Sequence, residues 1–198
     1  DIFIRTLFVT FSFLWVTYLG SKLGEDYLAV NTILMQFIIL AAFFLDSYAF
    51  STEGVIGFTI GRKNKNSFLS VVKNSIQISF ITALMVSIFY IIFFKQMVNI
   101  ITDIELLRFI SYKHLLWVII IPPIASFCYQ LDGIFIGASQ TKEMRNAMII
   151  SVISFIIISI YLTKYFGNHG LWFSLLCFMI LRSLTLKFYF NKILNEVF

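Results

Sequence analysis

The chain has 198 residues, of which 60% are hydrophobic and 13% are charged, and its formal net charge is +5. Soluble domains carry about 25% charged and about 45–50% apolar residues. This composition therefore excludes a water-soluble domain, which would have to expose much of its Phe, Ile and Leu. In a bilayer, the outside of a helix bundle can be as apolar as its inside. We therefore predict an all-α integral membrane protein whose surface contacts the lipid bilayer.

The apolar runs predict six membrane-spanning helices in one bundle that covers residues 1–198, because about 20 apolar residues cross the hydrocarbon core. In chain order, the expected spans are residues 2–19, 27–60, 75–94, 115–138, 147–163 and 171–186. The mixed segment Lys95–Lys113, between the third and fourth spans, is predicted to form a short interfacial helix.

Two of these spans are expected to be irregular. The second has 34 residues, which would extend about 51 Å at 1.5 Å per residue against a hydrocarbon core of about 30 Å. It should bend, tilt or project beyond the bilayer, and Gly54, Gly57 and Gly61 favour a bend in its second half. The fourth span contains Pro122 and Pro123, which remove two backbone donors and should kink or break the helix.

The basic residues of the loops predict the orientation of the chain. Nine of them flank the spans on one side: Arg5, Arg62, Lys63, Lys65, Lys73, Lys142, Arg145, Lys187 and Lys192. Only five lie on the other side, together with four acidic residues. Since cytoplasmic loops are the richer in Lys and Arg, both termini of this segment should face the cytoplasm. Both termini on one side imply an even number of spans, which agrees with the six predicted from hydropathy. These residues do not form the basic, aromatic-interleaved patch of a nucleic-acid interface, so no nucleic-acid partner is expected.

Four ionisable residues lie inside the predicted spans. They are Asp46 and Glu53 in the second span, Asp132 in the fourth and Arg182 in the sixth. An Asp at the centre of a membrane helix costs about 2.5–3.5 kcal/mol, so these side chains should face the bundle interior or a water-filled cavity. Asp46 and Glu53 are seven residues apart, close to two helical turns, and project from one face.

Further polar side chains accompany these charges. Tyr129 and Gln130 precede Asp132, while Asn31 and Gln36 lie earlier on the second span. A helix broken at the proline pair would free backbone carbonyls that can bind a cation where they line a cavity.

The intramembrane acids allow two functional interpretations and one structural interpretation. They bind a proton or a sodium ion, or they line the path of a cationic substrate. In the structural interpretation, Asp132 or Asp46 pairs with Arg182, or accepts hydrogen bonds between helices, and ties the bundle together.

No catalytic motif is present in the sequence. It contains no HExxH, GxSxG or P-loop pattern and no Cys/His cluster. Cys128 and Cys177 lie in apolar runs and are predicted to be reduced thiols. We therefore expect no enzyme activity, no cofactor and no metal centre.

Four segments carry more specific motifs: Ala29–Phe37, Leu45–Arg62, Asp132–Met148 and Gly167–Trp172, the last followed by Arg182. Together they resemble the C-terminal half of a multidrug and toxic compound extrusion (MATE) transporter, in the DNA-damage-inducible F (DinF) branch. The resemblance covers most of the chain.

This resemblance implies a twelve-helix antiporter in the bacterial cytoplasmic (inner) membrane, with two six-helix lobes around a central cavity. Members of the family export organic cations and other toxic compounds in exchange for H⁺ or Na⁺ by alternating access. The chain would supply one lobe, and the N-terminal lobe, which holds the best-known proton-binding aspartate of the branch, would be its partner. Asp46, Glu53 and Asp132 would be cavity residues of the C-terminal lobe.

Two alternatives to this antiporter stay open at the level of the sequence. A lipid-linked saccharide flippase of the same superfamily would need a more cationic cavity to hold a pyrophosphate. Three acids against one arginine, Arg182, favour cationic or neutral cargo instead. An integral-membrane enzyme acting on lipids would need a catalytic cluster near an interface.

Overall fold

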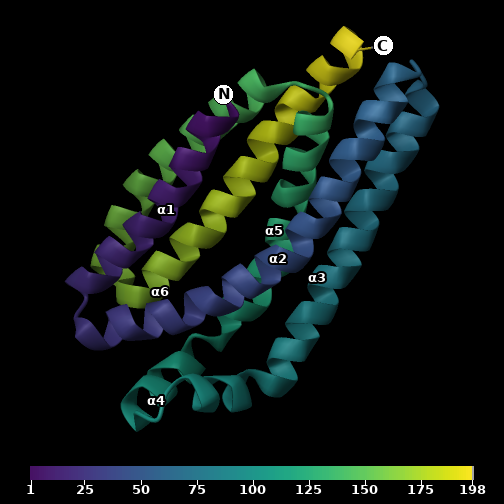
Figure 1. Ribbon diagram of the computed structural model, residues 1–198. Coiled ribbons are helices and arrows are strands. Elements are labelled where there is room, and N and C mark those ends of the chain that lie inside the picture. Colours follow the sequence, from purple (N-terminus) through teal and green to yellow (C-terminus); the bar gives the residue numbers. More distant parts are fainter. Residues whose placement is uncertain (198) are drawn as a thin grey trace.

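A computed structural model describes residues 1–197, which form helices and no strand. In chain order the helices are α1 (Ile2–Lys22), α2 (Glu25–Gly61), α3 (Lys65–Ile101), α4 (Glu105–Lys113), α5 (Leu115–Gly137) and α6 (Thr141–Val197). All except α4 are long and apolar enough to cross a membrane. Figure 1 shows both termini at one end of the bundle and α4 at the other.

Helix α6 consists of two arms that meet at Gly167. This residue has φ 56° and ψ −137°, a conformation outside the helical region that favours glycine. The chain turns back on itself there, so the two arms lie antiparallel (Figure 1). Gly170 follows the turn, and a Cβ atom on it would collide with the carbonyl oxygen of Leu162. The fifth and sixth predicted spans therefore lie in the two arms of one interrupted helix.

The third span is longer than hydropathy predicts. Helix α3 begins at Lys65, ten residues before the expected start, because the side chain of Asn64 accepts a hydrogen bond of 2.9 Å from the backbone amide of Ser67. This cap satisfies one of the free amides at the helix start. Helices α2 and α3 each have 37 residues and form a long antiparallel hairpin (Figure 1).

Helix α5 lies at the centre of the bundle, in contact with α2, α3, α4 and α6. Its glycines allow a close approach to α2. A Cβ atom on Gly133 would collide with the carbonyl oxygen of Ala49, and one on Gly137 would lie 3.0 Å from the side chain of Ile56. Small residues bring membrane helices together in this way. The approach places the polar residues of α5 directly beside those of α2.

The prolines were predicted to kink or break the helix, and the break is wrong, because α5 is helical from Leu115 to Gly137 with Pro122 and Pro123 inside it. Pro123 has no amide to bond the carbonyl of Ile119, four residues earlier. Ser87 of α3 donates its hydroxyl to that carbonyl at 2.8 Å. A neighbouring helix thus replaces a lost backbone bond, and the Ile119 carbonyl is not free to bind an ion.

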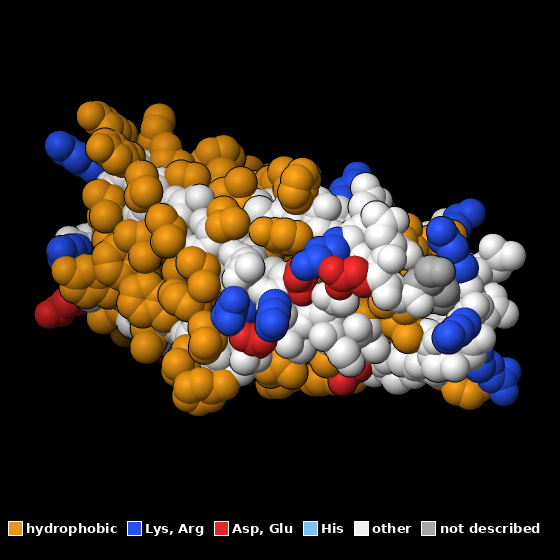
Figure 2. Space-filling model, turned by 90° about the horizontal axis from the view of Figure 1, so that it is seen from above, with side chains coloured by type: hydrophobic (Ala, Val, Ile, Leu, Met, Phe, Trp, Pro, Cys, Tyr) orange, Lys and Arg blue, Asp and Glu red, His pale blue; other side chains and the backbone are white. Residues whose placement is uncertain are grey.

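Hydrophobic side chains also cover much of the outside of the bundle. Figure 2 shows them over a large part of one face, with Lys and Arg side chains gathered toward one end. Phe3, Phe43, Phe50 and Phe58 are among the exposed aromatic residues. Such a surface suits lipid or the face of another membrane domain.

Candidate functional site: a charged cavity between four helices

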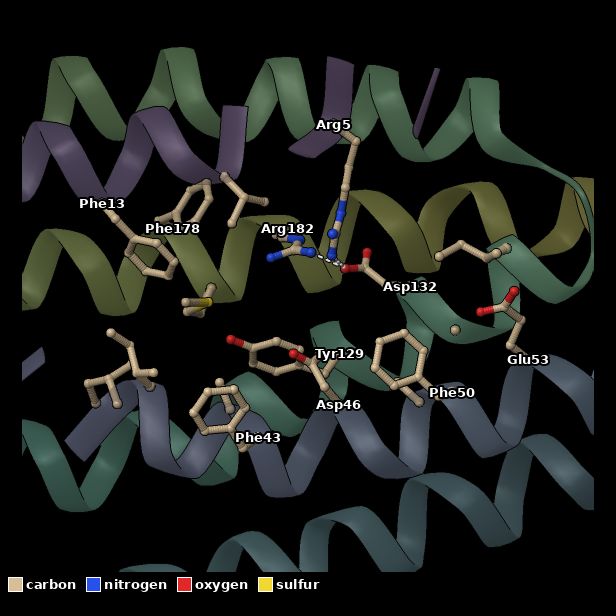
Figure 3. A pocket seen from close by; sticks show the side chains of 18 residues that line it. Arg5, Phe13, Phe43, Asp46, Phe50, Glu53, Tyr129, Asp132, Phe178 and Arg182 are labelled. Carbon is tan, nitrogen blue, oxygen red and sulfur yellow. Dashed lines mark hydrogen bonds and ion pairs between the residues drawn. The ribbon is translucent and has the colours of Figure 1, made fainter. Parts of the chain in front are cut away.

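A cavity of about 270 Å³ lies between α1, α2, α5 and α6. Five charged side chains line it: Arg5 from α1, Asp46 and Glu53 from α2, Asp132 from α5, and Arg182 from α6. Figure 3 shows these side chains pointing toward a common space. Charges from four helices therefore converge inside a bundle whose surface is apolar.

Asp132 is held by two arginines. Its Oδ2 atom accepts hydrogen bonds from Nη2 of Arg5 and from Nη2 of Arg182 (Figure 3). Asp132 and Arg182 are 3% and 2% exposed, and the side chain of Arg5 is 20% exposed. Two guanidinium groups around one carboxylate leave a surplus of one positive charge on this side of the cavity.

Three polar atoms of this group have no partner. Oδ1 of Asp132, Nε of Arg5 and Nε of Arg182 are buried and make no hydrogen bond to the described residues. Buried polar atoms are rarely left unpaired, because the loss of solvation is costly. The cluster of Asp132, Arg5 and Arg182 therefore keeps two donors and one acceptor unsatisfied inside the bundle.

The carboxylates on α2 are less constrained. Asp46 and Glu53 are half-buried and form no ion pair or side-chain hydrogen bond within residues 1–197. Asp46 lies close enough to Arg5, Arg182 and Asp132 to interact with them electrostatically. The α2 side of the cavity therefore carries unpaired negative charge opposite the arginines.

Aromatic rings line the cavity around the charged groups. Phe13, Phe43, Phe50, Phe178 and Tyr129 line the cavity, and Figure 3 shows their rings around it. The guanidinium carbon of Arg182 lies 6.0 Å from the ring centre of Tyr129, within reach of a cation–π contact. The lining can thus contact a flat apolar body as well as charged groups.

The structure brings together five of the residues singled out in the sequence. Asp46, Glu53, Tyr129, Asp132 and Arg182 line the cavity. The pairing of Asp132 with Arg182, which was the structural interpretation, is present in the same place. Asp132 and Arg182 therefore form an ion pair and line the cavity at the same time.

Three other predicted residues lie outside this cavity. Gln130 is fully buried, with its Oε1 atom 3.0 Å from the hydroxyl of Thr52, and links α5 to α2. Asn31 and Gln36 line a second cavity of about 260 Å³ between α1 and α2. Asn31 is buried and hydrogen-bonded to Asn168 and Trp172.

Sequence reasoning missed Arg5 as a cavity residue. It was counted among the basic residues that flank the spans, but it lies one turn inside α1 and reaches Asp132. The inventory of three acids against one arginine is therefore wrong for this cavity, which contains two arginines. The available signal was that three apolar residues, Ile2 to Ile4, precede Arg5, but so short a stretch does not distinguish the flank of a span from its interior.

The residues offer no metal centre. Among residues 1–197, no group of three or more His, Cys, Asp or Glu side chains is arranged to hold a metal ion.

Comparisons with known proteins identify the family. The MatE family model matches residues 2–163. DNA damage-inducible protein F of Escherichia coli (strain K12) is 34% identical over 186 residues, which are 94% of this chain and 40% of that protein. The chain thus spans about two-fifths of the length of this relative.

Solved structures share the fold. An outward-facing multidrug resistance MATE transporter of the MOP superfamily matches with a TM-score of 0.85 and 18% identity, over 96% of this chain and 43% of that one. An inward-facing structure of such a transporter matches with a TM-score of 0.80 and 17% identity, over 98% and 45%. The chain therefore belongs to the MatE family, whose members are membrane transporters and not enzymes.

Proposed function

We propose that the chain is the C-terminal lobe of an ion-coupled antiporter that exports small organic cations across the bacterial cytoplasmic membrane in exchange for H⁺ or Na⁺. The observation that carries this proposal is the cavity at which three carboxylates and two arginines meet from four helices. Ionisable groups inside membrane segments mark ion and substrate pathways. Because the chain belongs to a transporter family, such a pathway supports a role in transport.

The α2 carboxylates are the residues best suited to exchange an ion. Asp46 and Glu53 line the cavity without an ion pair among the described residues, so a proton or a cation can bind them without displacing a protein partner. Asp132 is already held by Arg5 and Arg182. We assign Asp132 the role of fixing the two arginines at the cavity wall.

Alternating access fits the fold of the lobe. The TM-scores to an outward-facing and an inward-facing structure are 0.85 and 0.80, so one arrangement of helices resembles both states. This supports a movement in which the lobe rocks against the N-terminal lobe as a nearly rigid body.

The flippase alternative is less well supported. A pyrophosphate carries several negative charges and needs a strongly cationic site. Two arginines and three carboxylates give this cavity a formal charge of −1. The enzyme alternative is excluded by the family to which the chain belongs.

The Asp132→Asn substitution tests the proposal in the full-length polypeptide with both lobes. Asparagine has nearly the same shape but leaves Arg5 and Arg182 without their counter-ion. We expect ion-driven export in membrane vesicles to fall about tenfold or more, which corresponds to roughly 1.4 kcal/mol at the site. Glu105→Gln on α4, outside the cavity, is the matched control. Undiminished export at normal protein levels contradicts the assignment.

A further inference from the structure

We propose that His169 and Trp117 form a proton-sensitive latch, which holds the turn between the two arms of α6 against the first turn of α5. The turn is built at Gly167, whose φ of 56° interrupts the helix. His169 follows this glycine by two residues and is exposed, so protons from the surrounding water can reach its ring. Both latch residues lie outside the charged cavity.

One hydrogen bond closes the latch. Nε1 of Trp117 donates to Nδ1 of His169 at 3.0 Å. An indole nitrogen only donates, so Nδ1 of His169 must carry no proton in order to accept this bond. A proton on Nδ1 would place two donors against each other. The bond therefore requires a neutral His169.

The stacked ring of His114 decides which imidazole takes up a proton. The rings of His114 and His169 have centroids 4.2 Å apart and planes inclined by 10°. His114 is 2% exposed, and both of its ring nitrogens have partners in the protein. His169 is exposed and keeps its second ring nitrogen available to water. Two charged rings at this distance would repel each other, so His169 is the ring that responds to acid.

The groups around the two rings are basic or uncharged. Lys113, at the end of α4, acts electrostatically on His114 together with His169. Lys164 lies in the first arm of α6, five residues before His169. Trp117 on α5 carries no charge. A proton on His169 therefore breaks the latch and also adds repulsion between the turn and its basic neighbours.

Other hydrogen bonds keep the second arm in place when the latch opens. Asn168 accepts a hydrogen bond of 2.7 Å from Asn31 of α2, and Trp172 donates to the same Asn31 at 2.8 Å. These bonds are buried and do not involve His169. We therefore expect acid to loosen the turn locally, without unfolding the arm.

An apolar cavity beside the latch gives the turn room to move. It has a volume of about 260 Å³ and lies between α5 and both arms of α6. Trp117, Phe166 and His169 are among the residues that line it. Once the hydrogen bond is lost, these rings can rearrange without displacing a packed core.

Amide hydrogen exchange of the full-length polypeptide at pH 7.5 and pH 5.5 tests the latch. Histidine is the side chain that ordinarily changes its charge in this range. After correction for the effect of pH on the chemical exchange rate, residues 163–172 should exchange about five- to tenfold faster at pH 5.5. This is the factor expected from the loss of one hydrogen bond. Residues 65–75, at the start of α3, provide an internal reference that should not change.

Three variants assign the effect to the two latch residues. His169→Gln takes up no proton and should remove the difference between the two pH values. Trp117→Phe lacks the donor, so the turn should exchange fast at both. Trp15→Phe is the matched control, because that indole donates to Ser159 at 2.9 Å instead of to His169. It should keep the full difference.

Equal corrected exchange at both pH values in the unmodified protein overturns the proposal, and this comparison does not depend on the folding of any variant. A difference that survives in His169→Gln but disappears in His114→Gln assigns the proton to the buried ring and also overturns it. An unchanged difference in Trp117→Phe overturns the role of Trp117. Since export is not the quantity measured, failure of the latch leaves the proposed transport function standing.

Discussion

At the scale of single residues, a chain of hydrogen bonds fixes the end of the bundle opposite the termini. Nε1 of Trp172 donates to Asn31 at 2.8 Å, and Nδ2 of Asn31 donates to Asn168 at 2.7 Å. Nδ2 of Asn168 lies 3.0 Å from Nε2 of His114, whose Nδ1 lies 2.8 Å from the carbonyl of Ile110. Only a neutral His114 with its proton on Nδ1 satisfies both neighbours.

This arrangement predicts a loss of stability in acid. Burial lowers the pKa of His114 below its ordinary value of 6.5, and the nearby His169 and Lys113 act in the same direction. The folded protein therefore binds fewer protons than the unfolded one, so the contribution of His114 is complete above about pH 6.5 and is lost as the pH falls below it. We expect the melting temperature in detergent to drop from pH 7.5 to pH 5.5, by about 2–4 °C for each kcal/mol lost.

Two variants check the source of this acid sensitivity. His114→Gln, which cannot take up a proton, should flatten the pH dependence. His169→Gln keeps the buried imidazole of His114 and should preserve most of it. An equally steep drop in His114→Gln would assign the effect to another group.

Residue types predicted part of the site. The cost of burying charge identified Asp46, Glu53, Asp132 and Arg182, all of which line one cavity. The same argument could not tell that Gln130 turns toward Thr52 rather than toward the cavity. Which way a side chain points depends on the neighbouring helix, and a single sequence does not specify that neighbour.

At the scale of elements, the contact between α2 and α5 depends on the absence of a side chain at Gly133. A methyl group there would collide with the backbone of Ala49, which cannot move without shifting α2. At Gly54, by contrast, no atom lies within 4 Å of an added Cβ. A glycine on α5 and a glycine on α2 should therefore differ in their tolerance of a methyl group.

We therefore expect Gly133→Ala to destabilise the protein by about 1–3 kcal/mol, the usual cost of overpacking. Gly54→Ala should instead stabilise it by up to about 1 kcal/mol, because alanine favours a helix. Thermal unfolding of both variants in detergent measures the difference. Equal melting temperatures would contradict so close a contact between α2 and α5.

Hydropathy predicted where the helices lie but not how they begin or continue. It missed the first ten residues of α3, of which six are polar, and this helix start has its cap at Asn64. It predicted a break at Pro122 and Pro123, where Ser87 of a distant segment supplies a replacement bond. Both errors concern hydrogen bonds, which apolar periodicity does not report.

At the scale of the whole molecule, the two ends of the bundle differ in charge. The termini, the turn at Arg62 and the turn before Thr141 lie at one end, and α4 lies at the other (Figure 1). We infer that the first end faces the cytoplasm, since it holds most of the loop Lys and Arg residues.

Labelling from outside intact cells tests this orientation. Asp103→Cys, next to α4, should react with a membrane-impermeant maleimide. Arg62→Cys should react only after the cells are permeabilised. The reverse pattern would invert the proposed topology, and the buried Cys128 provides an unreactive internal reference.

The length of the α2–α3 hairpin has a mechanical consequence. Each helix has 37 residues and is about 55 Å long, well beyond the thickness of the hydrocarbon. The turn at Arg62, where the hairpin ends, is exposed, and the same helix α2 carries Asp46 and Glu53. A movement of this turn would displace both carboxylates together. A molecule that binds the turn would therefore act on the cavity from outside the membrane.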